Sequence, residues 1–280
     1  MDMNINRLIK RIISFFIIIS FLSACAQRKE PVVIDDINDL HGLKVGTMLA
    51  WECDYLLTGR EDMKLYRYDQ ISDMLMALNY DKIDAIAVDM LLWNLINNAS
   101  NGLKMIEPPF GRTGYLLYVH PDHRDFVDQY NVFLKEFKKT DTYKDLSERE
   151  LNFDGTYDAP DIPLTGNGNT YKIAFDISGY PRAFYDTEKD EVTGFDIEVL
   201  KHFSNEYDYQ LDFVLTDFND AYAGLQNGIY DAIIGYLSDA YKEEVENVGI
   251  IVTDVYDEIP LVFACKETTG NIDVDMNSLE

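Results

Sequence analysis

The sequence around Cys25 predicts a chemical modification of its thiol. It ends the run LSAC (22–25), which follows an apolar stretch at 12–21 and the basic residues Arg7, Lys10 and Arg11. A stretch of about ten apolar residues is too short to cross a bilayer, and this pattern is typical of a signal peptide. LSAC resembles a bacterial lipobox, in which small residues precede a cysteine whose thiol receives a diacylglycerol. We therefore expect residues 1–24 to be removed and the lipid on Cys25 to attach the protein to the extracytoplasmic face of the cell membrane. The alternative is an ordinary signal peptide with a chance cysteine.

The remaining cysteines and the histidines give little support to metal chemistry. Cys53 and Cys265 lie far apart, in no spacing typical of a metal site, and we expect two buried thiols. A disulfide between them is the alternative in an oxidising compartment. His120 and His123 flank a Pro-Asp turn with no cysteine or third ligand nearby. The sequence therefore predicts no metal site and no cofactor.

Three polar or aromatic side chains follow expected strands, where ligand contacts concentrate in α/β folds. Asp176 ends a strand expected at 171–175, and Tyr180 lies in the loop after it. Asp89 ends a buried strand expected at 83–88. Each has a structural alternative: a turn cap for Asp176, a core aromatic for Tyr180 and the N-cap of the next helix for Asp89.

The charge balance argues against one class of partner. The chain carries 24 Lys and Arg against 50 Asp and Glu, a formal net charge of −26. Removal of residues 1–24 takes away three basic residues and one acidic residue, so the processed chain carries −28. Such a surface repels phosphate backbones and anionic lipid headgroups. We expect no nucleic-acid partner, and we expect the acyl chains to be the membrane anchor.

Strands alternate with helices along the chain, which predicts parallel α/β sheets. After a polar tether at 25–36, we expect strands at 43–48, 83–88 and 115–119 and helices near 54–57, 71–78, 90–97 and 126–139. From residue 171 onward we expect strands at 171–175, 210–215, 230–234 and 261–265 and helices at 195–206 and 221–226. Residues 152–170 are rich in Gly, Pro, Asn and Asp, which indicates a linker between lobes.

The two parts of the chain repeat one another. LKVGTML (43–49) corresponds to YKIAFDI (171–177), and ALNYDKIDAIAVDM (77–90) corresponds to GLQNGIYDAIIGYL (224–237). In both parts a helix ending in AL or GL precedes a short Asp-containing turn and a buried strand. Two similar α/β lobes imply a cleft between them, and such clefts bind small molecules.

Several blocks in register resemble the amino-acid (family 3) type of extracellular solute-binding protein that serves ABC importers. GYPRAFYDTEKDEVTGFDIEVL (179–200) and DFNDAYAGLQNGIYDAIIG (217–235) resemble the first lobe of that family. Blocks that resemble its second lobe are DINDLHGLKVGTMLA (36–50), YDKIDAIAVD (80–89), GYLLYVHPDH (114–123) and TYKDL (142–146). The resemblance implies a periplasmic-binding-protein-like II fold: two Rossmann-like lobes with a hinge, whose strands would be 115–119 and 261–265.

The lobes stand in reversed order. Residues 37–151 resemble the second lobe with its C-terminal helix, 152–170 are the linker, and 171–280 resemble the first lobe. Two interpretations fit: a circular permutant, or the front of a longer tandem protein. Either one supplies a complementary pair of lobes.

The resemblance also implies a ligand site. In the family, an aromatic side chain stacks on a free amino acid, an Arg with Thr and Gly amides binds its carboxylate, and an acid pairs with its ammonium. The residues at or near these positions, which we expect to bind the ligand, are Tyr180, Asp176, Phe218, Lys242, Asp89, Trp51 and Glu52.

The expected carboxylate site departs from the family pattern. Lys242 stands in the position of the Arg, and Ala50 and Trp51 stand in the position of the Gly/Thr pair. Lys does not reproduce the bidentate fork of Arg, and Trp cannot present the open backbone of Gly. The departure predicts a cationic, aromatic or larger polar solute, or lobes that have lost binding.

The resulting prediction is a lipid-anchored solute-binding protein that captures a small polar solute, amino-acid-like or amine, for an ABC permease. A ligand-sensing module of a signalling system is the first alternative. An enzyme similar to cyclohexadienyl dehydratase is the second, and it is less well supported because no His occupies an expected site position and Lys242 replaces the Arg. We therefore expect no enzymatic activity.

Overall fold

The computed structural model describes residues 33–176, 179–267 and 270–275. Cys25, the expected signal peptide at 1–24 and most of the expected tether lie outside the described residues. Among the residues that the structure describes, no helix is long and apolar enough to cross a membrane.

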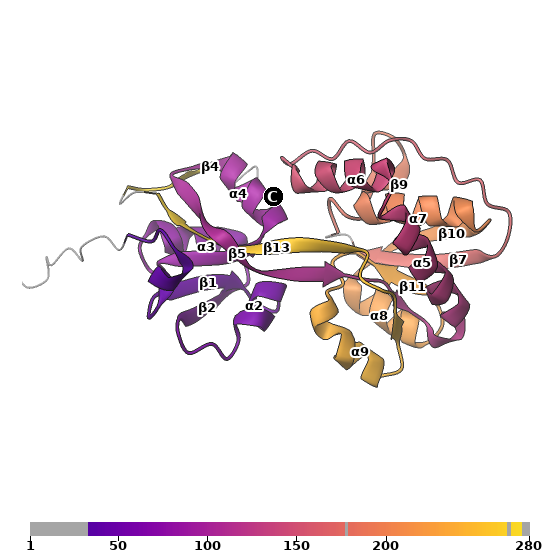
Figure 1. Ribbon diagram of the computed structural model, residues 1–280, viewed down its shortest axis with the longest axis horizontal. Helices are drawn as coiled ribbons and strands as arrows, with labels where there is room; N and C mark the ends of the chain where they lie inside the picture. The colour runs from indigo at the N-terminus through magenta and orange to yellow at the C-terminus, as the bar shows by residue number, and fades with distance from the viewer. Residues whose placement is uncertain (1–32, 177–178, 268–269, 276–280) are drawn as a thin grey trace, which may run out of the picture. The chain divides into compact units, whose positions relative to one another are not determined.

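The first of two five-stranded sheets has the strand order β2-β1-β3-β13-β5 (Figure 1). Its strands are β1 (Lys44–Met48), β2 (Lys64–Tyr68), β3 (Ala85–Asp89), β5 (Leu103–Tyr115) and β13 (Asp257–Lys266). β1 pairs in parallel with β2 and β3, whereas β13 runs antiparallel to both β3 and β5. A short helix, η1 (Ile37–Leu40), precedes β1, and the helices that follow β1, β2 and β3 are α2 (Glu52–Leu57), α3 (Ile71–Asn79) and α4 (Met90–Ala99). We call this sheet and these helices the β1 lobe.

The second five-stranded sheet has the order β10-β7-β11-β6-β12. Its strands are β7 (Thr170–Asp176), β10 (Gln210–Thr216), β11 (Ala232–Ile234), β6 (Tyr118–Val119) and β12 (Ile251–Val252). The accompanying helices are η2 (Pro121–His123), α5 (Arg124–Phe137), α6 (Asp141–Leu151), α7 (Phe195–Glu206), α8 (Phe218–Gln226), η3 (Asp239–Tyr241) and α9 (Lys242–Asn247). A hairpin, β8 (Phe184–Asp186) with β9 (Glu191–Thr193), precedes α7. We call this assembly the β7 lobe. A further two-stranded pair joins β4 (Ser100–Asn101) to β14 (Asp273–Val274).

Each sheet takes its fourth strand from the other part of the chain. β13 comes from the second part and lies between β3 and β5, whereas β6 comes from the first part and lies between β11 and β12. Both donated strands are antiparallel to their neighbours. The lobes therefore do not coincide with the expected continuous segments 37–151 and 171–280.

The central strands are apolar because both of their faces are covered. All five residues of β3 are buried. Ile86 and Val88 belong to one hydrophobic cluster, and Ala85 and Ala87 belong to another. Successive side chains of a strand point to opposite faces, so the run AIAVD contributes to two cores at once.

Helix α5 packs against α7 within the β7 lobe. Phe126, Tyr130 and Phe133 recur at helical spacing on its buried face. Their rings lie 5.1, 5.1 and 5.5 Å from the ring of Phe203 in α7. The helical end of the expected 37–151 segment is thus part of the β7 lobe.

The stretch 152–170 does not link the two lobes, contrary to the prediction. It joins α6 to β7, and Leu146 and Ile173 from these two elements share one hydrophobic cluster. Tyr157, within the stretch, is buried in the same cluster. Asn205 fixes the later part of the stretch, since its side chain accepts from the Thr165 amide at 2.8 Å and donates to the Pro163 carbonyl at 2.9 Å.

The predicted fold class, α/β with two Rossmann-like lobes, is confirmed by these two sheets. The expected strands at 43–48, 83–88 and 171–175 correspond to β1, β3 and β7. The sequence did not predict β2, α9 or β12, and it missed the length of β5, of which only the last residue lay in an expected strand.

Candidate functional site

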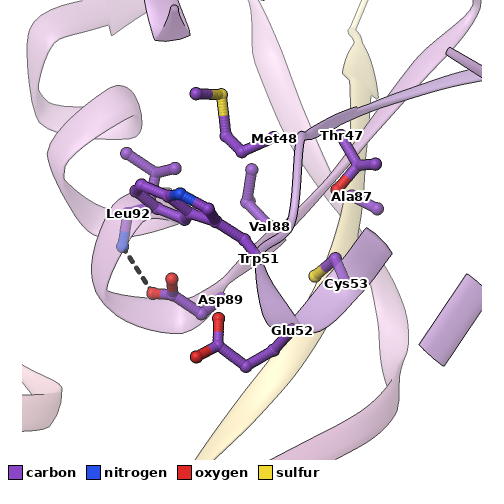
Figure 2. A pocket seen from close by; sticks show the side chains of 9 residues that line it. All are labelled: Thr47, Met48, Trp51, Glu52, Cys53, Ala87, Val88, Asp89 and Leu92. Carbon is purple, nitrogen blue, oxygen red and sulfur yellow. Dashed lines mark hydrogen bonds between the residues drawn. The ribbon is translucent and has the colours of Figure 1, made fainter. Parts of the chain in front are cut away.

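A small pocket lies where β1 and β3 end and α2 begins (Figure 2). Its volume is about 10 Å³, which is room for about one water molecule. Ligands of open α/β sheets bind beyond the carboxyl ends of the strands, which is where this pocket lies. Its lining residues are Thr47, Met48, Trp51, Glu52, Cys53, Ala87, Val88, Asp89 and Leu92. The structure therefore brings together three of the predicted site residues: Trp51, Glu52 and Asp89.

A sharp turn at Ala50 sets the position of Trp51. Ala50 has a φ of 60°, in the left-handed region that L-residues rarely occupy. Its amide donates to Asp54 Oδ2 at 3.0 Å, and Asp54 Oδ1 accepts from Arg67 Nε at 2.7 Å. Trp51 directly follows the turn as the N-cap residue of α2, with 42% of its surface exposed. The indole is therefore available to a ligand.

Asp89 is held in place by the helix that follows it. Its Oδ1 accepts from the Leu92 amide at 2.8 Å, so Asp89 is the N-cap of α4. This is the structural role that the sequence offered as an alternative to ligand binding. Burial raises the pKa of the Asp89 carboxyl, and the hydrogen bonds from the Leu92 and Leu91 amides oppose that shift.

Glu52 lies beside Asp89 in the pocket (Figure 2). Burial, followed by the negative charge of Asp89, raises the pKa of the Glu52 carboxyl to about 7. The positive charge of Arg182 acts in the opposite direction, and Asp239 raises the pKa further. Near neutral pH, Glu52 is thus close to the midpoint of its titration.

Thr47 contributes a buried polar atom. Its side chain is fully buried, and its Oγ1 has no hydrogen-bond partner among the residues that the structure describes. Buried hydroxyls are normally hydrogen-bonded, because leaving one unsatisfied costs about 1–3 kcal/mol. No sequence signal marked this residue, since a Thr in the strand KVGTM also fits an ordinary core position.

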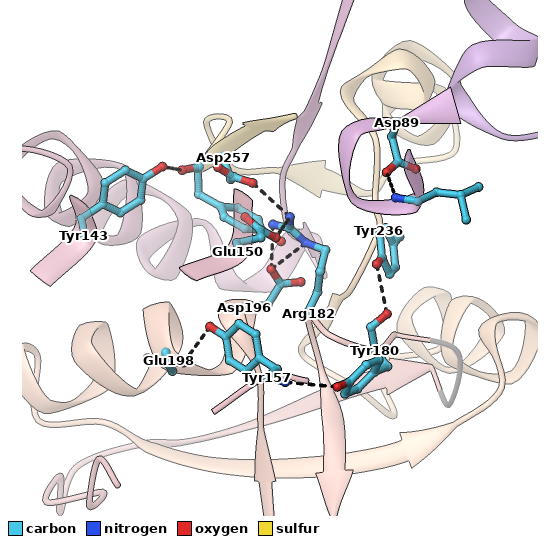
Figure 3. Close-up of polar contacts among 12 residues, drawn as sticks. Asp89, Tyr143, Glu150, Tyr157, Tyr180, Arg182, Asp196, Glu198, Tyr236 and Asp257 are labelled. Carbon is cyan, nitrogen blue, oxygen red and sulfur yellow. Dashed lines mark hydrogen bonds and ion pairs between the residues drawn. The ribbon is translucent and has the colours of Figure 1, made fainter. Parts of the chain in front are cut away.

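Tyr180 is not part of the pocket lining, and its polar atoms have partners within the β7 lobe. Its hydroxyl donates to the Gly155 carbonyl at 2.9 Å and accepts from the Tyr157 amide at 3.2 Å. Its carbonyl accepts from the Tyr236 hydroxyl at 3.1 Å (Figure 3). The loop of Tyr180 is therefore fixed by the 152–170 stretch.

The other predicted site residues also lie outside the pocket lining. Phe218 begins α8 and is 45% exposed, with its ring 6.0 Å from that of Tyr222. Lys242 begins α9, and its Nζ lies 4.0 Å from Glu246 Oε1. Asp176 ends β7.

The sequence analysis missed a buried ionic cluster around Arg182 (Figure 3). The Arg182 side chain is fully buried. It forms ion pairs with Asp196 at 2.9 Å and Asp257 at 3.0 Å, and a third with Glu150. Its guanidinium carbon lies 4.2 Å from the centre of the Tyr115 ring, close enough for a cation–π contact. Burial, followed by interactions with Asp257, raises the pKa of Glu150 well above its usual range, although Arg182 opposes the shift.

The Arg182 cluster joins the ends of β5 and β13, which lead from one lobe to the other, to two helices of the β7 lobe. Tyr115 ends β5, Asp257 begins β13, Glu150 lies in α6 and Asp196 lies in α7. These residues are up to 142 positions apart in sequence, so no local pattern reveals them. The one available signal was an Arg inside GYPRAF, where the family carries an aromatic-Pro-Pro-Phe stretch.

Residues of η3 contact the β1 lobe beside the pocket. The Tyr241 hydroxyl donates to the Ala50 carbonyl at 3.0 Å, and its ring lies 5.3 Å from that of Tyr55. The Asp239 carboxylate accepts from the Gly114 amide at 3.0 Å. The turn that presents Trp51 is therefore bound directly by the other lobe.

The search for metal-binding groups covered only the residues that the structure describes. Within them, no group of three or more His, Cys, Asp or Glu side chains is placed to hold a metal ion. Cys53 and Cys265 are free thiols in the interior.

Comparisons with solved structures give distant likenesses. An ancestral amino acid-binding protein, described as a precursor of cyclohexadienyl dehydratase, shares 13% identity over 81% of this chain and 82% of its own, with a TM-score of 0.39. The VFT2 domain of BvgS from Bordetella pertussis shares 12% identity over 80% of each chain, with a TM-score of 0.39. Arginine-bound, truncated ArgBP from T. maritima shares 16% identity over 84% of this chain and 92% of its own, with a TM-score of 0.36. No curated protein matches the sequence.

A family model gives the decisive match. It covers residues 171–272, which contain the two sequence blocks that resemble the first lobe. The match agrees with the periplasmic-binding-protein-like II fold expected for the two lobes. It confirms the family resemblance, whereas the reversed order of the lobes stays a prediction. Residues 171–272, little more than a third of the chain, therefore match the model of the bacterial extracellular solute-binding proteins, family 3.

Proposed function

We propose that this protein captures a small polar solute outside the cytoplasm and delivers it to an ABC permease. In this proposal, the diacylglycerol on Cys25 anchors the protein to the membrane. The protein binds its solute and releases it chemically unchanged. The family of residues 171–272 supports the solute-binding role.

The observation that carries the proposal is the pocket at the ends of β1 and β3. An exposed indole, two carboxylates and a buried hydroxyl without a partner among the described residues line it. Small-molecule sites of proteins typically combine an apolar wall with a few placed polar groups. The pocket holds about one water-sized group, so a larger solute needs the contacts between Tyr241 and the Ala50 turn to open.

A thermal-shift screen tests the binding role. The panel contains the twenty amino acids, aliphatic mono- and diamines, and short peptides. A ligand that binds only the folded state raises the melting temperature, by an amount equivalent to about 2.7 kcal/mol at a hundred times its Kd. We expect at least one compound to raise the melting temperature of the wild type and to have less effect on Trp51→Ala. A panel without effect on the wild type would contradict the proposal.

Recovery of the bound compound distinguishes binding from catalysis. The compound that stabilises the protein is incubated with it overnight, extracted and analysed by mass spectrometry. We expect it to be recovered unchanged. Conversion to a product that also requires Glu52 would instead support an enzyme.

The lipid anchor has its own test. Metabolic labelling with an alkyne analogue of palmitate should tag the wild type and leave Cys25→Ser unlabelled. Cys53→Ser is the matched control, since that thiol is buried and should not affect labelling. Equal labelling of wild type and Cys25→Ser would rule out the proposed anchor.

A further inference from the structure

Three acids share one cation in the Arg182 cluster (Figure 3). Glu150, Asp196 and Asp257 each form an ion pair with Arg182, and each is at most 5% exposed. Among the residues that the structure describes, no second Lys, Arg or His forms an ion pair with any of the three. With every carboxyl ionised, the cluster would hold two uncompensated negative charges in the interior. Burying such charge is so costly that an acid in this setting binds a proton instead.

Two of the three carboxyl groups bind the same nitrogen. Glu150 Oε1 and Asp257 Oδ2 both accept from Arg182 Nη1, whereas Asp196 Oδ1 accepts from Arg182 Nε at 3.0 Å. Two carboxyl groups held side by side in the interior do not both ionise, and one proton is shared between them. The proton therefore belongs to the pair formed by Glu150 and Asp257.

The ends of two helices favour different charge states of these acids. Glu150 is the penultimate residue of α6, at the helix end where C=O groups without intrahelical partners carry partial negative charge. Asp196 is the second residue of α7, at the helix end where free N–H groups favour a carboxylate. Asp257 belongs to β13, and the positive charge of Lys138 interacts favourably with it. Glu150 is therefore the least stable of the three acids as an anion.

The other groups around Glu150 do not compensate a charge on it. The titratable side chains that interact with Glu150 are Arg182, Asp257, Asp196, Tyr143, Tyr157 and Tyr236. Burial raises the pKa of each tyrosine, so all three are neutral at pH 7. Burial also raises the pKa of Glu150 well above its usual range, which Arg182 opposes and Asp257 increases.

Glu150 and Asp257 connect the β7 lobe to a strand that leaves it. Glu150 lies in α6, whereas Asp257 is the first residue of β13 and pairs with Tyr115, the last residue of β5. Both strands belong to the sheet of the β1 lobe. A proton between Glu150 and Asp257 thus connects a helix of one lobe to a strand that leads to the other.

We propose that Glu150 is a neutral acid at pH 7 and that the proton it shares with Asp257 holds α6 against the start of β13. In alkaline solution the proton is lost, two carboxylates then face each other, and the contact between α6 and β13 weakens. This pH-sensitive contact is independent of the solute-binding role proposed above.

Urea denaturation of the wild type and Glu150→Gln from pH 6 to pH 8 tests the charge state. In this range a neutral Glu150 holds a proton that the unfolded chain has lost, because the usual pKa of Glu is 4.5. We expect the unfolding equilibrium constant of the wild type, relative to that of Glu150→Gln, to rise about tenfold per pH unit. Both proteins contain Glu52, so its titration cancels from the ratio. A constant ratio would overturn the proposal.

Asp196→Asn is the matched comparison, since it makes the same kind of substitution at an acid that we expect to be ionised. At pH 7 it should raise the unfolding equilibrium constant at least about a hundredfold, because it removes a charge that compensates Arg182. Glu150→Gln should raise it less than about tenfold, because Gln matches the neutral acid in charge and shape. Failure of Glu150→Gln to fold, or equal effects of the two substitutions, would overturn the neutral state of Glu150.

Infrared spectroscopy detects the proton directly. The measurement uses the Glu52→Gln background, since the pKa of Glu52 is also raised, to about 7. At pH 8 we expect this protein to show a carbonyl band of a protonated carboxyl group that disappears when Glu150→Gln is added. Identical spectra of the two proteins in that region would contradict the proposal.

Hydrogen exchange tests whether the proton holds α6 in place. The Tyr256 amide, next to Asp257, donates to the Tyr115 carbonyl at 2.9 Å. At pH 7 we expect this amide to exchange at least about tenfold faster in Glu150→Ala than in the wild type, and at the wild-type rate in Glu150→Gln. Glu148→Ala removes an exposed acid from the same helix and should leave the rate unchanged. Equal rates in Glu150→Ala and the wild type would overturn the contact proposed between α6 and β13.

Discussion

Arg182 is the residue whose loss should most reduce the free energy of unfolding. It is fully buried and pairs with three acids. Removing one partner of a buried ion pair typically costs about 3–5 kcal/mol, because the other charge stays buried without compensation. We expect this loss for Arg182→Met in urea denaturation. Arg182→Lys keeps the charge but not the planar fork, so it should lose less.

Arg60→Met is the matched control for this prediction. Arg60 pairs with Asp62 at the surface, where both side chains are more than a third exposed. Surface pairs contribute about 0–1 kcal/mol, so the control should differ little from the wild type. Equal effects of the two substitutions would show that the Arg182 cluster does not stabilise the fold.

Glu52 should make the protein less stable as the pH rises. Its pKa is about 7 in the folded protein, compared with a usual value of 4.5. Between these values the folded state holds a proton that the unfolded state has lost, so the free energy of unfolding falls with rising pH and levels off above about 7. Glu52→Gln removes this decrease. Urea titrations at pH 5 and pH 8 should therefore show a smaller difference in the variant, and an unchanged difference would contradict the raised pKa.

At the scale of elements, β13 is stabilised by hydrophobic packing on both of its faces. Phe263 belongs to one hydrophobic cluster, and Val262 and Ala264 belong to another. The Phe263 ring stacks on Phe110 at 4.2 Å. Phe263→Ala should cost about 3–5 kcal/mol in denaturant unfolding, because it leaves a cavity between the sheet and Phe110. Glu258→Ala, at an exposed position of the same strand, should stay within about 0.5 kcal/mol of the wild type.

Buried central strands and amphipathic helices could be predicted from the sequence, whereas edge strands and long-range ion pairs could not. The run AIAVD is apolar because β3 is covered on both faces, so its composition alone identifies it. β2 is the edge strand of its sheet and is mostly exposed, so KLYRY lacks that signal. β5 was missed because it contains residues that are typical of loops: Pro108, Pro109, Gly111 and Gly114.

The candidate site likewise contains residues that could be predicted from the sequence and residues that could not. Asp89 was predicted because it ends an expected strand, whereas Trp51 and Glu52 were predicted from the family resemblance. The folded chain brings all three together at the ends of β1 and β3. Arg182 and its partners were missed, since their contacts depend on how the two parts of the chain interleave.

At the scale of the whole molecule, the strands exchanged between the two sheets should keep the two fragments of a cleaved chain associated. A protease site placed at Asp161, an exposed residue of the 152–170 stretch, divides the chain between α6 and β7. Each fragment supplies a central strand to the sheet of the other, β6 in one direction and β13 in the other. We expect the fragments to elute together in gel filtration after cleavage and to separate only in denaturant. Separation in native buffer would contradict the exchange.

The exchange of strands also sets an order of events during synthesis. Residues 33–115 emerge early, but the sheet that they form lacks its fourth strand until residues 257–266 follow. Until then the edges of β3 and β5 that β13 will cover expose unpaired N–H and C=O groups, which can pair with other chains. Pairing over such a sequence separation also slows folding, because a long loop must close first. The nascent β1 lobe is therefore prone to pair with other chains until residues 257–266 have been made.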